Sequence, residues 1–437
     1  MRSDGTQVRL GAIAQVNPPR RIRKGQPVSF VEMAALPQHS RDIAPADIQT
    51  RTAKGSGAHF QNGDTLLARI TPCLENGKTA LVRGLQSGEI GEGSTEFIVL
   101  CGTDPADNDF IYYLCRHPDF RQYAISRMEG TSGRQRVSWQ PIAAFEFECP
   151  APARRREAAA LLSLIDDRID LLRQTNATLE SIAQALFKSW FINFDPVRAK
   201  AEGREPDGMD AATAALFPSE FEESELGAIP KGWSVQPVGD LVEAVGGSTP
   251  DTKNEAFWAP SVHHWTSPKD LSGATAPVLL DTERKVSEAG LAKISSGLLP
   301  AGTLLMSSRA PIGYLSLAQI PVAINQGYIA MLPGGRLPPA YMYFWCKLNM
   351  DAIKGRANGS TFMEISKKAF RPIPAVLPAP ELVEKFLDFA SPVFNRVTSN
   401  ELQARSLAAL RDTLLPRLIS GALRLPEAEA QIDEAIA

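Results

Sequence analysis

Asn62-Gly63-Asp64-Thr65-Leu66-Leu67-Ala68-Arg69 is answered later in the chain by Ala301-Gly302-Thr303-Leu304-Leu305-Met306-Ser307-Ser308-Arg309. A Gly/Ser/Thr turn follows each copy, Gly130-Thr131-Ser132-Gly133 in the first half and Asn358-Gly359-Ser360-Thr361 in the second. Each half then reaches a Pro-rich stretch and continues into a long segment with periodic apolar residues. This order predicts a mixed module followed by a helix, written twice in tandem.

The segment after the first module has apolar residues at strict seven-residue spacing. One series is Ile165, Leu172, Leu179 and Leu186, and a companion series offset by four is Ile169, Asn176, Ala183 and Trp190. Two such series form the a/d seam of a coiled coil, sustained here for about four heptads. The alternative is a helix that packs on a globular core.

A shift of 224 residues brings the same series onto the C-terminal segment as Val393, Asn400, Leu407 and Leu414. Phe389 and Leu410 fall in the companion row, which Arg396 and Gln403 interrupt. Because an Asn at an a-type position fixes register and partner at a cost in stability, the equivalent Asn176 and Asn400 predict that the two helices pair. The second module lies between them along the chain, so the pairing is expected to be antiparallel.

Each module is expected to mix short strands with helices. Residues 28–33, 65–70 and 96–100 predict strands of the first module, and 109–128 predicts a helix. Residues 302–306 and 324–332 predict strands of the second module, followed by a helix at 339–352.

The predicted fold class is α+β, with two tandem mixed modules separated by two long antiparallel coiled-coil helices in a pseudo-twofold repeat. We expect a first module at 1–152, a central helix at 153–195, an exposed and partly irregular linker at 196–227, a second module at 228–379, a distal helix at 380–421 and a frayed acidic tail at 422–437.

Composition narrows the class of protein. The chain has 437 residues, of which 44% are hydrophobic and 22% charged, as in an ordinary globular protein. No apolar run reaches the roughly eighteen residues that a membrane span needs, and Met1-Arg2-Ser3-Asp4 does not begin a signal peptide. The five cysteines show no Cys-x-x-Cys spacing, which favours a cytoplasmic protein without a zinc site.

The net charge of −3 is unevenly distributed. Counted from the sequence, residues 1–150 carry +1, 151–227 carry −5, 228–379 carry +4 and 380–437 carry −3. The modules are therefore neutral to basic and the helical segments acidic. This allows a nucleic-acid surface on the modules, although ordinary scatter of surface charge would give the same totals.

Catalytic motifs are missing from the sequence. Asn17-Pro18-Pro19-Arg20 resembles the [Asn/Asp]-Pro-Pro-aromatic motif of amino-methyltransferases, but Arg20 replaces the aromatic residue and no Gly-x-Gly loop follows a strand. Walker A, Gly-x-Ser-x-Gly and His-Glu-x-x-His sequences are also absent. A non-catalytic binding protein is favoured; the alternatives are a stand-alone DNA methyltransferase or nuclease and a purely protein-binding scaffold.

Basic and small polar residues gather at turns of both modules, where they can hold phosphates and reach base edges. For any one of them the plainer interpretation is a solvated surface charge. The candidate DNA-binding residues are Arg20, Arg21, Arg23, Lys24, Arg69, Thr131, Ser132, Arg134 and Arg136 in the first module, and Thr249, Lys253, Lys269, Arg309, Ser360, Thr361 and Lys367 in the second.

Several stretches together carry a family resemblance. They are Gly247-Ser248-Thr249-Pro250 with Phe257-Trp258, Trp265 to Leu271, Asn358 to Pro378, and the helix Leu161–Trp190 running into Phe191 to Val197. With its duplicated layout, the chain resembles the DNA-specificity (S) subunit of Type I restriction–modification enzymes over nearly its whole length. The first module departs from the pattern, since it has Asn17-Pro18-Pro19 in place of Gly-x-Thr-Pro.

The resemblance implies a subunit without catalysis or cofactor of its own. It implies that two methyltransferase subunits, which bind S-adenosylmethionine, and ATP-driven, Mg-dependent restriction subunits assemble on it. The modules would then be target-recognition domains that read the two different halves of a bipartite site on double-stranded DNA, and the helices would be spacers.

Overall fold

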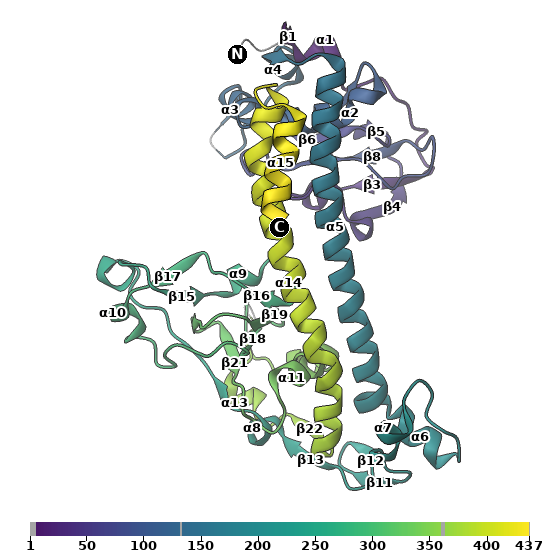
Figure 1. The fold of residues 1–437 in the computed structure, drawn as a ribbon, viewed down its shortest axis with the longest axis vertical. Helices are drawn as coiled ribbons and strands as arrows, with labels where there is room; N and C mark the ends of the chain where they lie inside the picture. The colour runs from purple at the N-terminus through teal and green to yellow at the C-terminus, as the bar shows by residue number, and fades with distance from the viewer. Residues whose placement is uncertain (1–5, 132, 360–362, 437) are drawn as a thin grey trace. The chain divides into compact units, whose positions relative to one another are not determined.

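The computed structural model describes residues 6–131, 133–359 and 363–436. The chain divides into two compact units. Unit 1 comprises Met1–Asp170 and Ala404–Ala437, and unit 2 comprises Leu171–Gln403. Two long helices, α5 (Pro152–Lys188) and α14 (Pro380–Ile419), contribute residues to both units (Figure 1).

Unit 1 contains two four-stranded sheets and a terminal strand pair. The first sheet has the order β2-β9-β6-β7, with strands Ala14–Val16, Phe97–Gly102, Thr65–Ala68 and Thr79–Leu81. The second has the order β4-β3-β8-β5, with strands Ile48–Thr52, Pro27–Val31, Gly91–Gly93 and Ala58–Phe60. Strand β1 (Thr6–Arg9) pairs antiparallel with β10 (Glu146–Cys149).

The helices of unit 1 are short, apart from its share of α5 and α14. They are α1 (Leu10–Ile13), η1 (Met33–Ala35), η2 (Pro45–Asp47), η3 (Pro105–Asp107), α2 (Asn108–Arg116), α3 (Pro118–Ser126), α4 (Trp139–Ala143) and α15 (Leu425–Ile436). The single helix expected over 109–128 is wrong: it breaks at His117, whose backbone is extended, because a following proline disfavours helical geometry. The tail expected to fray forms α15 instead, and its Ala428 is buried.

Unit 2 repeats this plan. Its main sheet has the order β14-β21-β18-β19-β16, with strands Ala244–Val245, Tyr328–Met331, Leu304–Ser307, Leu315–Ala318 and Val278–Leu279. The smaller sheet has the order β17-β15-β20, with strands Arg284–Val286, His263–Thr266 and Ala323–Ile324. Two further antiparallel pairs are β13 (Ser234–Pro237) with β22 (Pro374–Leu377), and β11 (Phe221–Ser224) with β12 (Gly227–Pro230).

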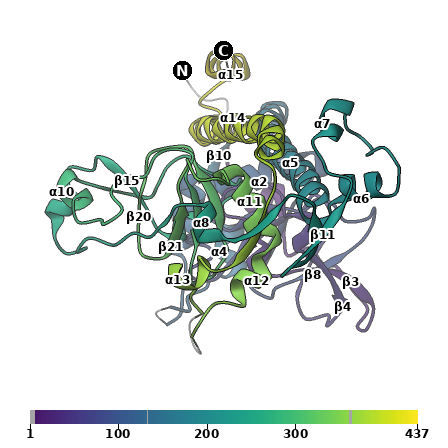
Figure 2. The same cartoon turned by 90° about the horizontal axis from the view of Figure 1, so that it is seen from below.

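The remaining helices of unit 2 are η4 (Ser189–Asn193), α6 (Asp195–Ala201), α7 (Ala211–Ala215), α8 (Val238–Leu241), η5 (Glu255–Phe257), α9 (Pro268–Leu271), α10 (Glu288–Leu291), α11 (Pro339–Leu348), α12 (Met350–Lys354) and α13 (Lys367–Phe370). Figures 1 and 2 both show β15 and α10 in a lobe on the side of the module away from the end of α5.

The duplication extends to strand pairing. Strands β2, β9, β6 and β7 take the places of β14, β21, β18 and β19 in sheets of the same order. In the smaller sheets, β3 pairs antiparallel with β4 and parallel with β8, as β15 does with β17 and β20. The predicted α+β repeat is therefore confirmed at the level of topology.

The register corrects one equivalence between the repeats. The carbonyl of Arg69 accepts the N–H of Val137 at 2.9 Å, and the carbonyl of Ser308 accepts the N–H of Ile365 at 3.0 Å. Ser308 is thus the counterpart of Arg69, and Arg309 lies one position further along. The two arginines that close the quoted repeat are not structural equivalents, because the second copy carries one extra residue before its arginine.

The two long helices pair antiparallel. Within unit 2, Asn400 Nδ2 donates to Asn176 Oδ1 at 2.8 Å, and the rings of Phe187 and Phe386 lie 5.4 Å apart. Residue numbers therefore rise along one helix as they fall along the other. Both asparagines are 2% exposed, so the predicted Asn–Asn pair is present and buried.

The buried face of α14 differs in part from the prediction. Val393, Asn400, Leu407 and Leu414 are buried as expected, but Phe389 of the expected companion row is 37% exposed. The row that is buried instead is Ala390, Val397, Ala404 and Arg411. In unit 2, Phe394 packs on Tyr343 of α11 at 5.4 Å, which turns this side of α14 toward the unit 2 core. In unit 1, Arg411 is buried where its Nη1 donates to Asp166 Oδ1 at 2.5 Å.

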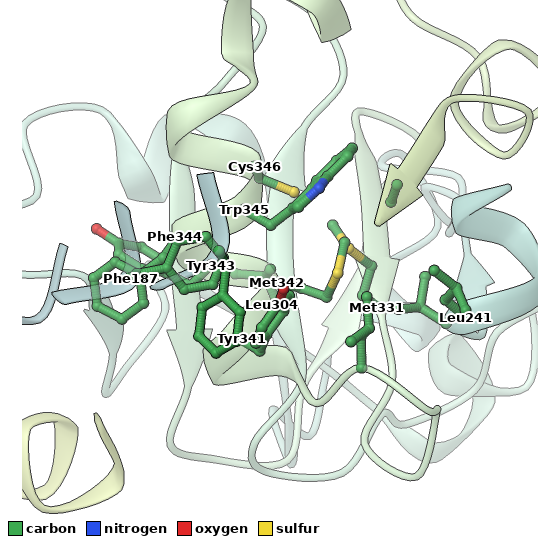
Figure 3. Close-up of a cluster of buried hydrophobic side chains, with 14 of the residues drawn as sticks. Phe187, Leu241, Leu304, Met331, Tyr341, Met342, Tyr343, Phe344, Trp345 and Cys346 are labelled. Atoms are coloured by element: carbon green, nitrogen blue, oxygen red, sulfur yellow. The ribbon is translucent and has the colours of Figure 1, made fainter. Parts of the chain in front are cut away.

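The core of unit 2 joins α5, α14 and α11 through aromatic side chains. Figure 3 shows Phe187 of α5 together with Tyr341 and Phe344 of α11. Phe187 of α5 contacts Tyr341 and Phe344 of α11 at ring distances of 4.7 and 5.9 Å. Both interpretations of the heptad series therefore hold for the end of α5, which pairs with α14 and also packs on a globular core. Fully burying side chains of this size stabilises the fold by roughly 1.5–3 kcal/mol each.

The predicted linker at 196–227 is more ordered than expected. It contains α6, α7 and the first strand of the β11–β12 pair, and Val197 and Phe217 are buried in the unit 2 core. Trp190 packs edge-on against Phe217 at 5.2 Å. The Pro and Gly residues that indicated irregular chain instead mark the boundaries of these short elements.

Candidate nucleic-acid interface

The basic cluster at the start of unit 1 divides into one half-buried residue and three exposed residues. Arg20 forms an ion pair with Asp64, whose side chain is 1% exposed, and donates from Nη2 to Asp64 Oδ1 at 2.8 Å. Its guanidinium is therefore committed to the interior, which speaks against the predicted role in DNA binding. Arg21, Arg23 and Lys24 are exposed and stay candidates.

The turn after α3 is closed by a two-residue bridge. Glu129 and Arg136 exchange both backbone hydrogen bonds at 2.9 Å. The Arg136 guanidinium forms a forked pair with Glu96, donating from Nε at 2.9 Å and from Nη2 at 2.7 Å to Oε1. Thr131 and Arg134 are exposed on the turn, and Ser132 lies outside the described residues. Arg134 is thus the better-placed candidate, whereas Arg136 mainly holds the turn.

The corresponding turn of unit 2 has a glutamate, Glu364, at the position that Arg136 occupies in unit 1. Asn358 and Glu364 form the bridge, and the Glu364 carboxylate lies 3.7 Å from the Arg309 guanidinium. The candidates Ser360 and Thr361 lie outside the described residues.

Arg69, a further candidate in unit 1, is half-buried, so its side chain can reach a ligand less easily than that of an exposed arginine.

The Gly246–Pro250 loop of unit 2 lies against several candidate residues. A Cβ on Gly247 would lie 1.8 Å from the Ile324 carbonyl oxygen, so this close approach requires glycine. Ser248 Oγ donates to the Lys293 carbonyl at 3.2 Å, and Thr249 Oγ1 donates to Gln326 Oε1 at 2.7 Å. This loop therefore fixes the exposed amide of Gln326, a side chain able to read a base edge.

The lysine candidates of unit 2 are all exposed, but they differ in whether an acidic residue already pairs with the side chain. Lys253 is exposed beside the same loop, and Lys367 is exposed with its side chain close to Gly246. Lys269 is exposed but forms an ion pair with Glu283 at 2.8 Å. The structure thus brings Thr249, Lys253 and Lys367 to one loop and places Lys269 in a separate pair.

Sequence reasoning missed Gln326, Lys293 and Arg284, which also contact this part of unit 2. Arg284 lies 3.4 Å over the Trp258 ring, and Lys293 lies 5.9 Å from the Phe257 ring. Their own sequence surroundings carry no recognisable motif. The only available signal was the tryptophan pair Trp258 and Trp265, which offers rings for a cation to stack on.

The described residues include five free cysteines and other side chains of the types that bind metal ions. Among them no group of three or more His, Cys, Asp or Glu side chains could hold a metal ion. Burial raises the pKa of the Cys115 and Cys346 thiols, which keeps them protonated and poor nucleophiles. In the part of the chain that the structure describes, no helix has the length and apolarity to cross a membrane.

Comparison with known proteins identifies a family model and several relatives. Residues 230–405 match the family model of the Type I restriction modification DNA specificity domain. The chain is 26% identical over 408 residues to the Type I restriction enzyme HindI specificity subunit of Haemophilus influenzae, covering 83% of this chain and 87% of that protein. It is 33% identical over 190 residues to the MjaIX specificity subunit of Methanocaldococcus jannaschii, covering 42% and 44% of the two chains.

A solved structure shares the fold. The crystal structure of the Type-I restriction-modification system S subunit from M. genitalium superposes with a TM-score of 0.55 at 15% identity, covering 95% of this chain and 96% of that one. Taken with the duplicated modules and the paired helices, these matches show that residues 230–405 form a Type I restriction modification DNA specificity domain, and that the chain is similar to Type I restriction enzyme specificity subunits over most of its length.

Proposed function

We propose that this chain recognises a bipartite, asymmetric sequence on double-stranded DNA, with one half-site read by each module. The observation that carries the proposal is a shared strand order and pairing with different side chains at equivalent positions. At the base of the equivalent turns, for example, unit 1 has Arg136 and unit 2 has Glu364. Two modules with the same backbone topology but different surface side chains are suited to binding two different half-sites.

The helices are proposed to set the spacing between the half-sites. At about 1.5 Å per residue, the 37 residues of α5 make a helix of about 55 Å, and the 40 residues of α14 one of about 60 Å. One turn of B-DNA spans about 34–36 Å, so helices of this length suffice for two modules on successive major grooves. The buried Asn176–Asn400 pair would fix their register.

The partners are proposed from the family. The relatives are named as specificity subunits of restriction enzymes, so we propose that this chain is a non-catalytic subunit that binds two methyltransferase subunits and restriction subunits. S-adenosylmethionine, ATP and Mg²⁺ would then be bound by those partners. A cytoplasmic location is proposed from the DNA substrate and from the free cysteines.

An exchange of modules tests the proposal. Residues 1–152 would be replaced by the first module of another specificity subunit, and the methylated adenines of host DNA would be mapped. The expected result is a new sequence at one half-site, with the other half-site and the spacer unchanged. Changes in both halves would refute modular reading, whereas DNA methylation by the purified chain alone would favour a stand-alone methyltransferase.

A further inference from the structure

Arg284 lies on a platform made by two tryptophans in the smaller sheet of unit 2. In the register of β15 and β17, Arg284 faces Trp265 directly. The Arg284 Cζ atom is 3.4 Å from the centre of the Trp258 ring and 5.6 Å from that of Trp265. The two indoles meet edge to face, with centroids 5.2 Å apart and planes at 89°.

The platform is held by the Gly246–Pro250 loop and the residues after it. Trp265 Nε1 donates to the Ser248 carbonyl at 3.3 Å, and Trp258 Nε1 donates to the Asp251 carbonyl at 3.1 Å. Trp265 is 6% exposed, so the base of the platform is fixed in the interior. The surface on which the guanidinium rests is therefore ordered before any ligand binds, so binding does not have to pay the entropic cost of ordering it.

The hydrogen-bonding groups of Arg284 are available. The residue is exposed, and no carboxylate or carbonyl among the described residues accepts its guanidinium N–H groups within hydrogen-bond distance. Stacking occupies a face of the guanidinium, whereas its five N–H groups point outward in the plane.

Unit 1 shows the contrasting case at the equivalent strand pair. Arg51 of β4 lies 3.0 Å over the Phe30 ring of β3, but its Nη2 is 3.3 Å from the buried carboxylate of Glu92. There the arginine closes an internal charge pair. The same strand pairing in unit 2 presents its arginine to solvent without such a carboxylate.

We propose that Arg284 binds DNA directly, through two parallel in-plane hydrogen bonds to a pair of adjacent acceptor atoms. This inference rests on the proposed DNA-reading function and assigns a contact within the half-site of unit 2. Two acceptor pairs on DNA fit this fork: O6 and N7 of a guanine in the major groove, and two oxygens of a backbone phosphate. Exposed Lys253, which belongs to the segment that holds Trp258, adds positive charge nearby.

The test uses the full chain assembled with its methyltransferase subunit, after the target has been mapped by adenine methylation. Arg284→Ala and Arg284→Lys would be compared with wild type on the target duplex, and on duplexes with each position changed in turn, at 50 to 200 mM salt. A guanine contact predicts that Arg284→Ala loses roughly 5- to 150-fold in affinity and relaxes specificity at one position, and that lysine does not restore it.

A phosphate contact predicts a different pattern. Arg284→Ala would then weaken binding to all duplexes by a similar factor and lower the salt slope by about 0.9, and lysine would restore much of the loss. Arg204→Ala is the control, because it removes one positive charge from unit 2 at a residue paired with Glu202 and should leave binding unchanged. An unchanged far-ultraviolet circular dichroism spectrum and an unchanged melting temperature would show that the variants remain folded.

Two outcomes count against the inference and separate it from the proposed function. If wild type prefers its target and Arg284→Ala binds every duplex with wild-type affinity and salt slope, Arg284 is not a DNA contact while DNA reading stands. If the wild-type complex shows no sequence preference, the proposed function fails and this inference fails with it.

Discussion

Replacing Asn176 by leucine should destabilise unit 2, and replacing Asn400 as well should restore it. The two amides share one 2.8 Å hydrogen bond and are each 2% exposed. A single leucine leaves the other amide buried without its partner, which costs about 1–3 kcal/mol. Two leucines leave no orphan amide, so the double variant should be close to wild type or above it. The coupling energy of the cycle is then at least about 2 kcal/mol.

Urea unfolding followed by tryptophan fluorescence measures these changes, because Trp190, Trp233 and Trp345 are buried in the same core. Hydrogen exchange of residues 390–403 would locate the change in unit 2. Leu171→Ala serves as the control, since this side chain is 52% exposed and should change stability by less than about 0.5 kcal/mol. A double variant as unstable as the sum of the singles would refute the paired-asparagine reasoning.

Two further substitutions test local features. In unit 1, burial favours neutral Asp107, but hydrogen bonds from Arg155 and Arg156 lower the pKa of this carboxyl below its usual range. Its stabilising effect is thus present above the unfolded pKa of about 3.9 and lost as the pH falls through the folded value. Asp107→Asn should cost about 3 kcal/mol at pH 7 and flatten the acid limb of a stability–pH profile, and an unchanged limb would contradict this. In unit 2, Gly247→Ala should lower thermal stability by about 1–3 kcal/mol or more, because its Cβ would overlap the Ile324 carbonyl oxygen, and wild-type melting would contradict the requirement for glycine.

The sequence predicted the features that depend on local periodicity. The seven-residue series of α5 and the matched asparagines predicted that the two helices pair antiparallel. This was possible because a helix that buries one face has apolar residues at a regular spacing in its sequence. The sequence repeat at residues 62–69 and 301–309 predicted the duplicated modules, because both copies keep the apolar residues of the same buried strand. The break at His117 also had a local cause, the following Pro118, which the apolar spacing of 109–128 obscured.

Features that depend on contacts between distant residues were missed. The ion pair of Arg20 with Asp64 joins residues 44 apart, so the basic run alone did not indicate that one of its members pairs with a buried carboxylate. The turn of α14 toward its module is set by Phe394 and Tyr343 across the unit 2 core. Arg284 became a candidate only when folding placed it over Trp258, from 26 positions away in the chain.

The modules repeat backbone geometry more faithfully than side chains, and this separation is what a reader of variable DNA sequences requires. Arg69 and Ser308 accept the same backbone hydrogen bond, so the bond fixes the turn whichever side chain is present. Arg51 and Arg284 lie on equivalent strands and both cover an aromatic ring, yet the first pairs with a buried carboxylate and the second is exposed. Because the sheets are held by main-chain pairing, a surface arginine can change from a structural to a recognition role without altering the scaffold that positions it.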